Sequence, residues 1–231
     1  IMTEKEVKLF AGEKAFPEKV RRNLEADSVR IYPYNEVYTY AQKIDKDQNV
    51  LISEKCVNSR LVSSIPENVT ILDRPNPTLL AKAVKNPVEM ENERTAHIKD
   101  GVAVTKFIHW LKTKVGEEKI TELGAAEKLY QFRSEQANFL GDRFDPIIAY
   151  GIHAAIVHYS ATEETDIPLE AKGMVLADTG GHYLEGTTDI TRTIVLGPVT
   201  EKEKKYFTSV LRGNLNLAAA KFKYGCTGLN L

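Results

Sequence analysis

Cysteine is scarce in this sequence of 231 residues: Cys56 and Cys226 are the only two, and they stand far apart in no metal-ligand spacing. That scarcity excludes a disulfide framework and a zinc ribbon. An excess of charge of one sign is also missing, because 31 Lys and Arg residues stand against 32 Asp and Glu residues, for a formal net charge of −1. A nearly neutral chain has no basic field to attract nucleic acid or an anionic membrane surface. We therefore expect neither as a partner.

Long apolar runs and targeting signals are missing as well. No run approaches the roughly 18 apolar residues of a membrane span, and the first residues, IMTEKEVKLF, lack the basic region and apolar core of a secretion signal. The first 85 residues contain no Gly-rich phosphate loop. What remains, 42% apolar and 27% charged residues, is the composition of a globular protein. We expect a cytoplasmic protein.

Residues 1–85 alternate short β-rich runs, such as VKLF and VRIY, with short amphipathic stretches. A strand followed by a helix, repeated, is typical of an α/β layer with a largely parallel sheet. We predict an α/β domain over residues 1–85 and assign it a structural or assembly role.

The pattern changes at Asn86, which is a plausible helix N-cap because Pro87 suits the first helical position and Glu89 stands three residues after the cap. Thr121 is expected to open a second helix, and Thr200 begins the capping box of a third. Between the second and third helices, residues 144–162 are β-rich, and a polar loop and the strand MVLA at residues 174–177 follow. This order predicts an α+β domain over residues 86–231. The start at Ile-Met and the unfinished pattern at the last residue lead us to expect part of a longer, here truncated, protein.

The stretch DTGGHYLEGTTDITRT, residues 178–193, places Asp178 and Asp189 on either side of a Gly-rich segment, although Asp is depleted in strands. If a tight turn at Gly180-Gly181 lets the two β segments pair, both carboxylates can converge on one face. Carboxylates brought together repel unless a cation neutralises them, and such a pair suits Mn, Mg or Ca, with room for two ions. Alternatively, Asp178 opens a turn and Asp189 pairs with Arg192 or faces solvent.

Residues 174–197, MVLADTGGHYLEGTTDITRTIVLG, resemble the D-x-G-x-x-Y-x-x-G-T-T-D-I-T-R-T signature of Xaa-Pro aminopeptidases, also called aminopeptidase P, within the pita-bread metallopeptidases. Further motifs follow the family in order: KNPVEMENERTAHIKDGVAV at residues 85–104, AAIVHYSA at residues 154–161, which resembles a strand of the family, and the helix that begins at residue 201. The resemblance implies a creatinase N-terminal-like, three-layer α/β domain, followed by the first part of an α+β pita-bread catalytic domain.

The resemblance also implies a site. In the family, two aspartates eleven positions apart bind a pair of divalent ions, usually manganese, together with a His and two Glu further along. Carried over, Asp178 would bind one ion and Asp189 would bridge both, with Zn or Co as alternative metals. The other three ligands have no counterpart among the 231 residues, so we expect these residues alone to be inactive and to bind metal weakly at most.

His158, in IVHY, matches the family's active-site histidine and is the expected catalytic and substrate-binding residue, donating to the oxyanion. Without the resemblance it would be read as a core histidine in an apolar strand. His153 has a weaker expected substrate-side role, whereas His97 and His109 read as structural and His182 as exposed. Tyr183 is expected to pack at the edge of the site.

The implied activity is metal-dependent release of the N-terminal residue from peptides with proline in the second position, by a homodimer. Three alternatives stay open: a metal-free homologue of the creatinase type, a non-catalytic scaffold that keeps the fold, and prolidase. Both aspartates argue against the first, and a His, Glu, Glu series further along the protein would exclude the second.

Overall fold

The computed structural model describes residues 1–230, apart from the side chain of Glu13. The chain divides into two compact units, Ile1–Val84 and Lys85–Leu231. Each unit has strands and a buried apolar cluster of its own. Within the described residues, no helix combines the length and the apolarity needed to cross a bilayer.

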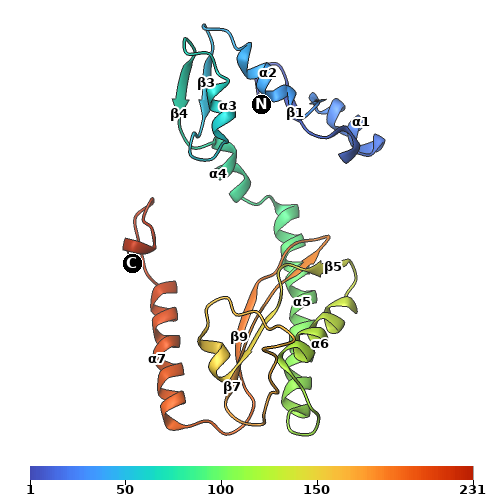
Figure 1. The fold of residues 1–231 in the computed structure, drawn as a ribbon, viewed down its shortest axis with the longest axis vertical. Helices are drawn as coiled ribbons and strands as arrows, with labels where there is room; N and C mark the ends of the chain where they lie inside the picture. Colours follow the sequence, from blue (N-terminus) through green and yellow to red (C-terminus); the bar gives the residue numbers. More distant parts are fainter. Residues whose placement is uncertain (231) are drawn as a thin grey trace. The chain divides into compact units, whose positions relative to one another are not determined.

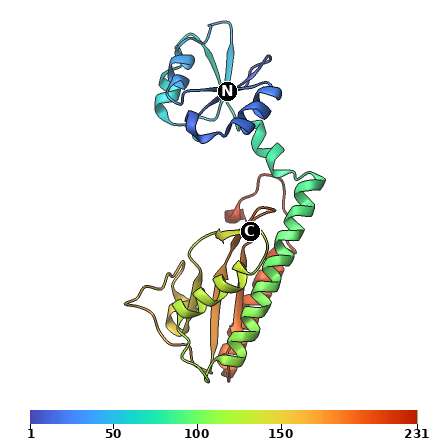
Figure 2. The ribbon, with the colours of Figure 1, turned by 90° about the vertical axis from the view of Figure 1, so that its right-hand side faces the viewer.

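The first unit is built from two parallel strand pairs. β1 (Val7–Phe10) pairs with β2 (Val29–Tyr32), and β3 (Asn49–Ile52) pairs with β4 (Thr70–Asp73). The parallel pairing expected from the strand and helix alternation is confirmed, in two two-stranded sheets. Figure 2 shows helices on both sides of these strands. The helices are η1 (Glu13–Ala15), α1 (Glu18–Ala26), α2 (Glu36–Gln42), α3 (Ser59–Ser63) and α4 (Pro77–Ala83).

The second unit begins with the predicted capping box. The Asn86 side chain accepts a hydrogen bond from the Glu89 backbone, and the Glu89 side chain accepts one from the Asn86 backbone, which starts the 28-residue helix α5 (Pro87–Lys114). Thr121 caps α6 (Glu122–Ser134), and Thr200 caps α7 (Glu201–Ala218). All three helix starts expected from local capping signals are confirmed.

The β segments of the second unit form two antiparallel sheets. The larger has the order β6-β7-β9, from β6 (Ile147–Tyr150), β7 (Met174–Thr179) and β9 (Ile190–Val195). The smaller pairs β5 (Phe139–Asp142) with β8 (Gly181–Tyr183). Two short 3-10 helices complete the unit, η2 (Gly151–Ala155) and η3 (Gly228–Asn230). The predicted α+β architecture is confirmed.

One face of the three-stranded sheet is buried by helices. Figure 1 shows α5 and α6 along this face and α7 on the other side of the sheet. Because side chains alternate along a strand, every second residue of the sheet enters the core and the residues between face the opposite, open side. The core joins Phe107, Leu111, Leu129, Ile148, Tyr150, Val175, Ala177 and Ile194.

The prediction of a tight turn at Gly180-Gly181 is wrong. Neither glycine has a positive φ, and the chain reverses later, where Tyr183 and Gly186 exchange backbone hydrogen bonds of 2.9 and 3.2 Å. Gly180 is required for a different reason, because a Cβ there would collide with the carbonyl oxygen of Thr188. The glycine allows two backbone segments to approach each other closely.

The prediction of a strand around His158 is also wrong. After β6 the chain enters η2, and residues 156–158 form a turn rather than an extended strand. Two residues of the segment have left-handed backbone conformations, Gly151 with a φ of 57° and His158 with a φ of 55°. The β-branched residues of AAIVHY favour an extended strand. The segment forms a 3-10 helix and a turn instead, because its residues contact Glu122 of α6.

Candidate functional site

The strand register places Asp178 and Asp189 on the open face of the sheet. Asp178 lies opposite Thr191 in the pairing of β7 with β9, and the Thr191 hydroxyl donates to Asp178 Oδ1 at 2.8 Å. Asp189 stands two residues before Thr191, at the start of β9, so by strand alternation it points to the same side. The predicted convergence on one face therefore agrees with the register, and a threonine hydroxyl orients the first carboxylate.

Asp189 forms an ion pair with Arg143, which follows β5. Its side chain is 54% exposed. Arg192, the partner considered from the sequence, instead directs its guanidinium to the backbone carbonyl of Thr191 at 2.7 Å. The backbone N–H of Arg143 donates to the Gly180 carbonyl at 3.0 Å. A cationic side chain thus lies against the carboxylate that, by the family resemblance, is expected to bridge the two ions.

Beneath residues 178–189 lies a fully buried ion pair between Asp100 of α5 and Arg133 of α6. Arg133 donates to the two Asp100 oxygens at 2.8 and 3.2 Å, to Thr179 Oγ1 at 2.9 Å and to the Gly180 carbonyl at 3.2 Å. Its Nη1 also reaches Asp142 at 3.2 Å. Burial is the main influence on Asp142 and raises the pKa of this carboxyl.

Asp100 collects two further donors from the same stretch. The Tyr183 hydroxyl donates to it at 3.0 Å and the Thr188 hydroxyl at 2.7 Å. Burial first, and then the Asp100 charge, raise the pKa of Tyr183. Tyr183 is therefore more than the packing residue expected from the sequence. One buried network ties the strand before the glycines and the strand after them to both helices.

Sequence reasoning missed Asp100 and Arg133, although a signal was present. Asp100 precedes the buried Phe107 by seven residues, and Arg133 follows the buried Leu129 by four. Both therefore fall on the apolar face of their helices. A charged residue on such a face is rarely fully buried without a partner, so the two positions could have been read as a pair.

Glu185 fastens the turn between β8 and β9 to α5. Lys99 Nζ lies 2.6 Å and Asn138 Nδ2 lies 2.8 Å from Glu185 Oε1. The hydrogen bond from Lys99, followed by that from Asn138, lowers the pKa of Glu185 to about 2. This turn is therefore held by charge on its outer side and by the buried network on its inner side.

His153 contacts Glu122, the first residue of α6. Its Nδ1 lies 2.9 Å from Glu122 Oε2, and its ring stacks on Tyr159 with 4.4 Å between centroids. Glu122 is fully buried. His158 itself is exposed and immediately precedes Tyr159. The sequence did not identify Glu122, whose position at the start of a helix reads as an ordinary acidic first turn.

The other histidines bind locally. His97 Nδ1 lies 2.8 Å from the Glu93 carbonyl on its own helix, and the exposed His182 places Nδ1 2.9 Å from Thr187 Oγ1. The expected exposure of His182 is confirmed. His109 lies on α5, away from the sheet's open face, and is exposed.

The donor set around Asp178 and Asp189 suits a hard cation, because both ligands are carboxylates on one side of a sheet. Residues 1–230 contain no group of three or more His, Cys, Asp or Glu side chains arranged to hold an ion. The described residues thus offer two oxygen ligands, with Arg143 beside one of them, and fit one side of a metal site.

Comparison with protein families decides the affiliation. Residues 91–231 match the model of metallopeptidase family M24, and residues 1–89 match the creatinase/prolidase N-terminal domain. The chain belongs to metallopeptidase family M24. The predicted combination of a creatinase N-terminal-like domain with a pita-bread domain is confirmed.

Among M24 relatives, the chain is 34% identical over its full length to the probable Xaa-Pro aminopeptidase P of Ajellomyces dermatitidis and covers 40% of that protein. It is 33% identical to Xaa-Pro aminopeptidase 1 of Dictyostelium discoideum, of which it covers 37%. The chain thus spans about two fifths of the length of these curated relatives.

A solved M24 structure shares the fold. The X-prolyl aminopeptidase of Caenorhabditis elegans, described as a cytosolic enzyme with a di-nuclear active site, matches 98% of this chain with a TM-score of 0.88 and 32% identity. This chain covers 38% of that chain. The two-unit architecture is therefore similar to that of an experimentally determined M24 protein.

Proposed function

We propose that this chain carries part of the active site of a metal-dependent aminopeptidase that releases the N-terminal residue from peptides with proline in the second position. The observation that supports the proposal is the register of β7 and β9, which pairs Asp178 with Thr191 on the open face of the sheet, while Asp189, immediately before β9, falls on the same side as Thr191 by alternation. Similarity over all of this chain to proteins named Xaa-Pro aminopeptidase favours this substrate class over a dipeptidase, a creatinase-type homologue or a scaffold.

Asp178 and Asp189 are the side chains of these residues that would hold the divalent ions. Manganese is the proposed metal, because carboxylate oxygens suit it. When bound, such ions supply Lewis acidity and lower the pKa of water towards neutrality. Thr191 holds Asp178 in place through its hydroxyl, and Arg143 balances the charge of Asp189 until an ion takes that role.

His158 is the proposed oxyanion donor, and His153 the proposed substrate-side residue. An exposed imidazole next to a fixed tyrosine can offer an N–H to a developing negative charge, where stabilisation lowers the barrier most. The contact of His153 Nδ1 with Glu122 leaves Nε2 as the nitrogen with which His153 would meet a substrate.

We also propose that the protein is a cytoplasmic homodimer. The resemblance to Xaa-Pro aminopeptidases favours the dimer, because dimerisation is common in that family. The relative from Caenorhabditis elegans is described as cytosolic. Light scattering coupled to gel filtration tests the dimer, and a monomeric mass at micromolar concentration would exclude it.

The activity is tested with the protein expressed from its complete reading frame, supplied with Mn²⁺ and two peptides that differ only in Pro or Ala at the second position. We expect release of the N-terminal residue from the Pro peptide alone, and loss of that activity in Asp189→Asn. Asp47→Asn, an equivalent change at an exposed site in the first unit, should leave it unchanged. Full activity in Asp189→Asn would contradict the proposal, and cleavage confined to dipeptides would indicate prolidase.

A further inference from the structure

One buried carboxylate contacts both ends and the middle of the segment that carries His158. Glu122 Oε1 accepts the backbone N–H of Tyr150 at 2.8 Å, and Oε2 accepts the Tyr159 hydroxyl at 2.9 Å. His153 Nδ1 lies 3.1 and 2.9 Å from the same two oxygens. Residues 150, 153 and 159 thus converge on a single side chain, although they lie 28 to 37 positions away from it in the sequence.

Tyr159, at the C-terminal end of the segment, is held by several contacts. Tyr159 is only 7% exposed, its ring stacks on His153 with an interplanar angle of 26°, and its hydroxyl also lies 3.3 Å from Thr165 Oγ1. Burial raises the pKa of the Tyr159 hydroxyl, with the nearby Glu122 acting in the same direction. The phenol therefore stays protonated and keeps donating to Glu122.

His158 has a backbone conformation that needs such support. Its φ of 55° lies in the left-handed region, which is unfavourable for a residue with a Cβ. Strained residues of this kind persist where the surrounding structure fixes their neighbours. Tyr159, the next residue, is fixed by Glu122, and Tyr150, at the other end of the segment, is fixed by the same carboxylate.

Glu122 is well placed to carry a buried charge. It is the first residue of α6, where a negative charge is favoured by the helix dipole. Its own backbone N–H donates to the Ile167 carbonyl at 3.1 Å, which fixes the helix start. Replacing a whole buried ion pair by apolar side chains of similar volume is often neutral or stabilising, so buried charge is weak evidence for a gain in stability. Glu122 accepts hydrogen bonds from three residues of one segment. These contacts are better explained by the conformation that they impose on the segment than by a contribution to the free energy of unfolding.

We infer that Glu122 is a positioning residue that sets the conformation of residues 151–158, and with it the placement of His158, and that it selects the tautomer of His153. A carboxylate can only accept hydrogen bonds, so His153 carries its hydrogen on Nδ1 and leaves Nε2 as an acceptor in the neutral ring. The inference rests on the proposed function in one respect, namely that His158 acts on substrate.

The test uses Glu122→Gln in the protein expressed from its complete reading frame. The amide oxygen can still accept the Tyr150 N–H, but the amide nitrogen is a donor that faces the Tyr159 hydroxyl and His153 Nδ1. We expect kcat on the Xaa-Pro peptide to fall about 10- to 100-fold with KM nearly unchanged, as for a misplaced catalytic group. Glu127→Gln, the same change at an exposed site of α6, should keep the wild-type kcat.

A second readout does not depend on activity. Nitrogen-15 NMR of the imidazole side chains should show His153 with its hydrogen on Nδ1 in the wild type and on Nε2 in Glu122→Gln. Wild-type kcat together with a wild-type His153 tautomer in the folded variant would overturn the inference. If wild-type protein does not cleave Xaa-Pro peptides, the proposed function fails, while the tautomer measurement still decides the role of Glu122.

Should Glu122→Gln not fold, Tyr159→Phe tests the same contact by removing only the hydroxyl that Glu122 accepts. We expect a smaller fall in kcat, with KM kept, and faster amide exchange of residues 156–159. A folded Tyr159→Phe protein with wild-type kcat and wild-type exchange would contradict the positioning role.

Discussion

The two acidic side chains of the site are held by different kinds of neighbour. Asp178 accepts a hydrogen bond from the neutral Thr191 hydroxyl, whereas Asp189 faces the charged Arg143. A hydroxyl orients a carboxylate and leaves its charge in place, but a guanidinium neutralises it. Arg143 should therefore compete with any cation that Asp189 binds.

Replacing Arg143 by Gln should strengthen Mn²⁺ binding. A half-exposed ion pair is worth about 0.2–1 kcal/mol, so removing it should lower the Kd for Mn²⁺ by a factor of about 1.4 to 5. Titration calorimetry with Mn²⁺ alone measures this, and Arg192→Gln is the matched control because its guanidinium contacts a backbone carbonyl. Weaker binding in Arg143→Gln would show that Arg143 supports the metal site instead of competing for it.

Glu185 should make stability depend on acid. Its folded pKa of about 2 lies below the ordinary value of 4.5, so its contribution to stability is present above about pH 4.5 and is lost as the pH falls towards 2. Urea unfolding across this range should therefore show a shallower loss of stability in Glu185→Gln than in the wild type. Lys99→Met removes the main cause of the shift and should flatten the profile similarly. A wild-type slope in both variants would contradict the assignment.

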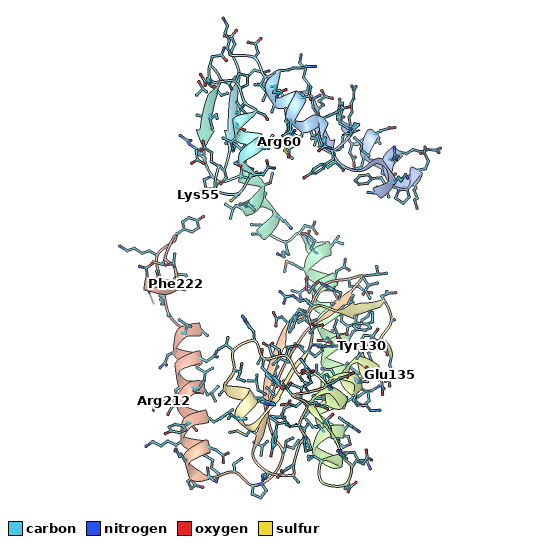
Figure 3. All side chains as sticks on the ribbon, viewed as in Figure 1. Lys55, Arg60, Tyr130, Glu135, Arg212 and Phe222 are labelled. Atoms are coloured by element: carbon cyan, nitrogen blue, oxygen red, sulfur yellow. The ribbon has the colours of Figure 1, made fainter. Side chains whose placement is uncertain are left out.

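At the scale of elements, the Asp100–Arg133 pair joins two helices to the strands that present the site. Its removal should act on stability first. Arg133→Met leaves Asp100 buried without its cation, and breaking a buried pair in this way costs about 3–5 kcal/mol, measurable by urea unfolding. Lys106→Met, which breaks an exposed pair with Glu135 between the same helices, should cost less than about 1 kcal/mol. Equal losses in the two variants would contradict the role of burial. Figure 3 labels Glu135, the residue that follows the last turn of α6.

The elements that were predictable from the sequence depend on local signals. The caps at Asn86, Thr121 and Thr200 act within one helical turn, and strand alternation placed Asp178 and Asp189 on one face. The strand and helix pattern similarly indicated parallel pairing in the first unit.

The features that were missed depend on residues far apart in the chain. Arg143 meets Asp189 across 46 positions, and Glu122 meets Tyr159 across 37. No local preference distinguishes AAIVHY as a strand from the 3-10 helix and turn that it forms, because the deciding hydrogen bonds come from α6. The prediction of a turn at Gly180-Gly181 failed for a similar reason, since Gly180 instead allows a close approach to the backbone of Thr188.

At the scale of the whole molecule, the chain belongs to a known family and carries two carboxylates of a proposed metal site. Membership of metallopeptidase family M24 rests on matches over residues 91–231 and on a shared fold. The assignment of Asp178 and Asp189 as metal ligands is a proposal supported by register and by donor chemistry. The chain covers 40% of the Ajellomyces dermatitidis relative, so the proposed activity is tested on the protein made from its complete reading frame.

Anomalous diffraction from crystals of that protein grown with Mn²⁺ tests the central claim most directly. We predict manganese peaks within coordination distance of carboxylate oxygens of Asp178 and Asp189, with Asp189 shared between two peaks and Arg143 turned away from it. Manganese bound elsewhere, with Asp189 still paired to Arg143, would contradict the account.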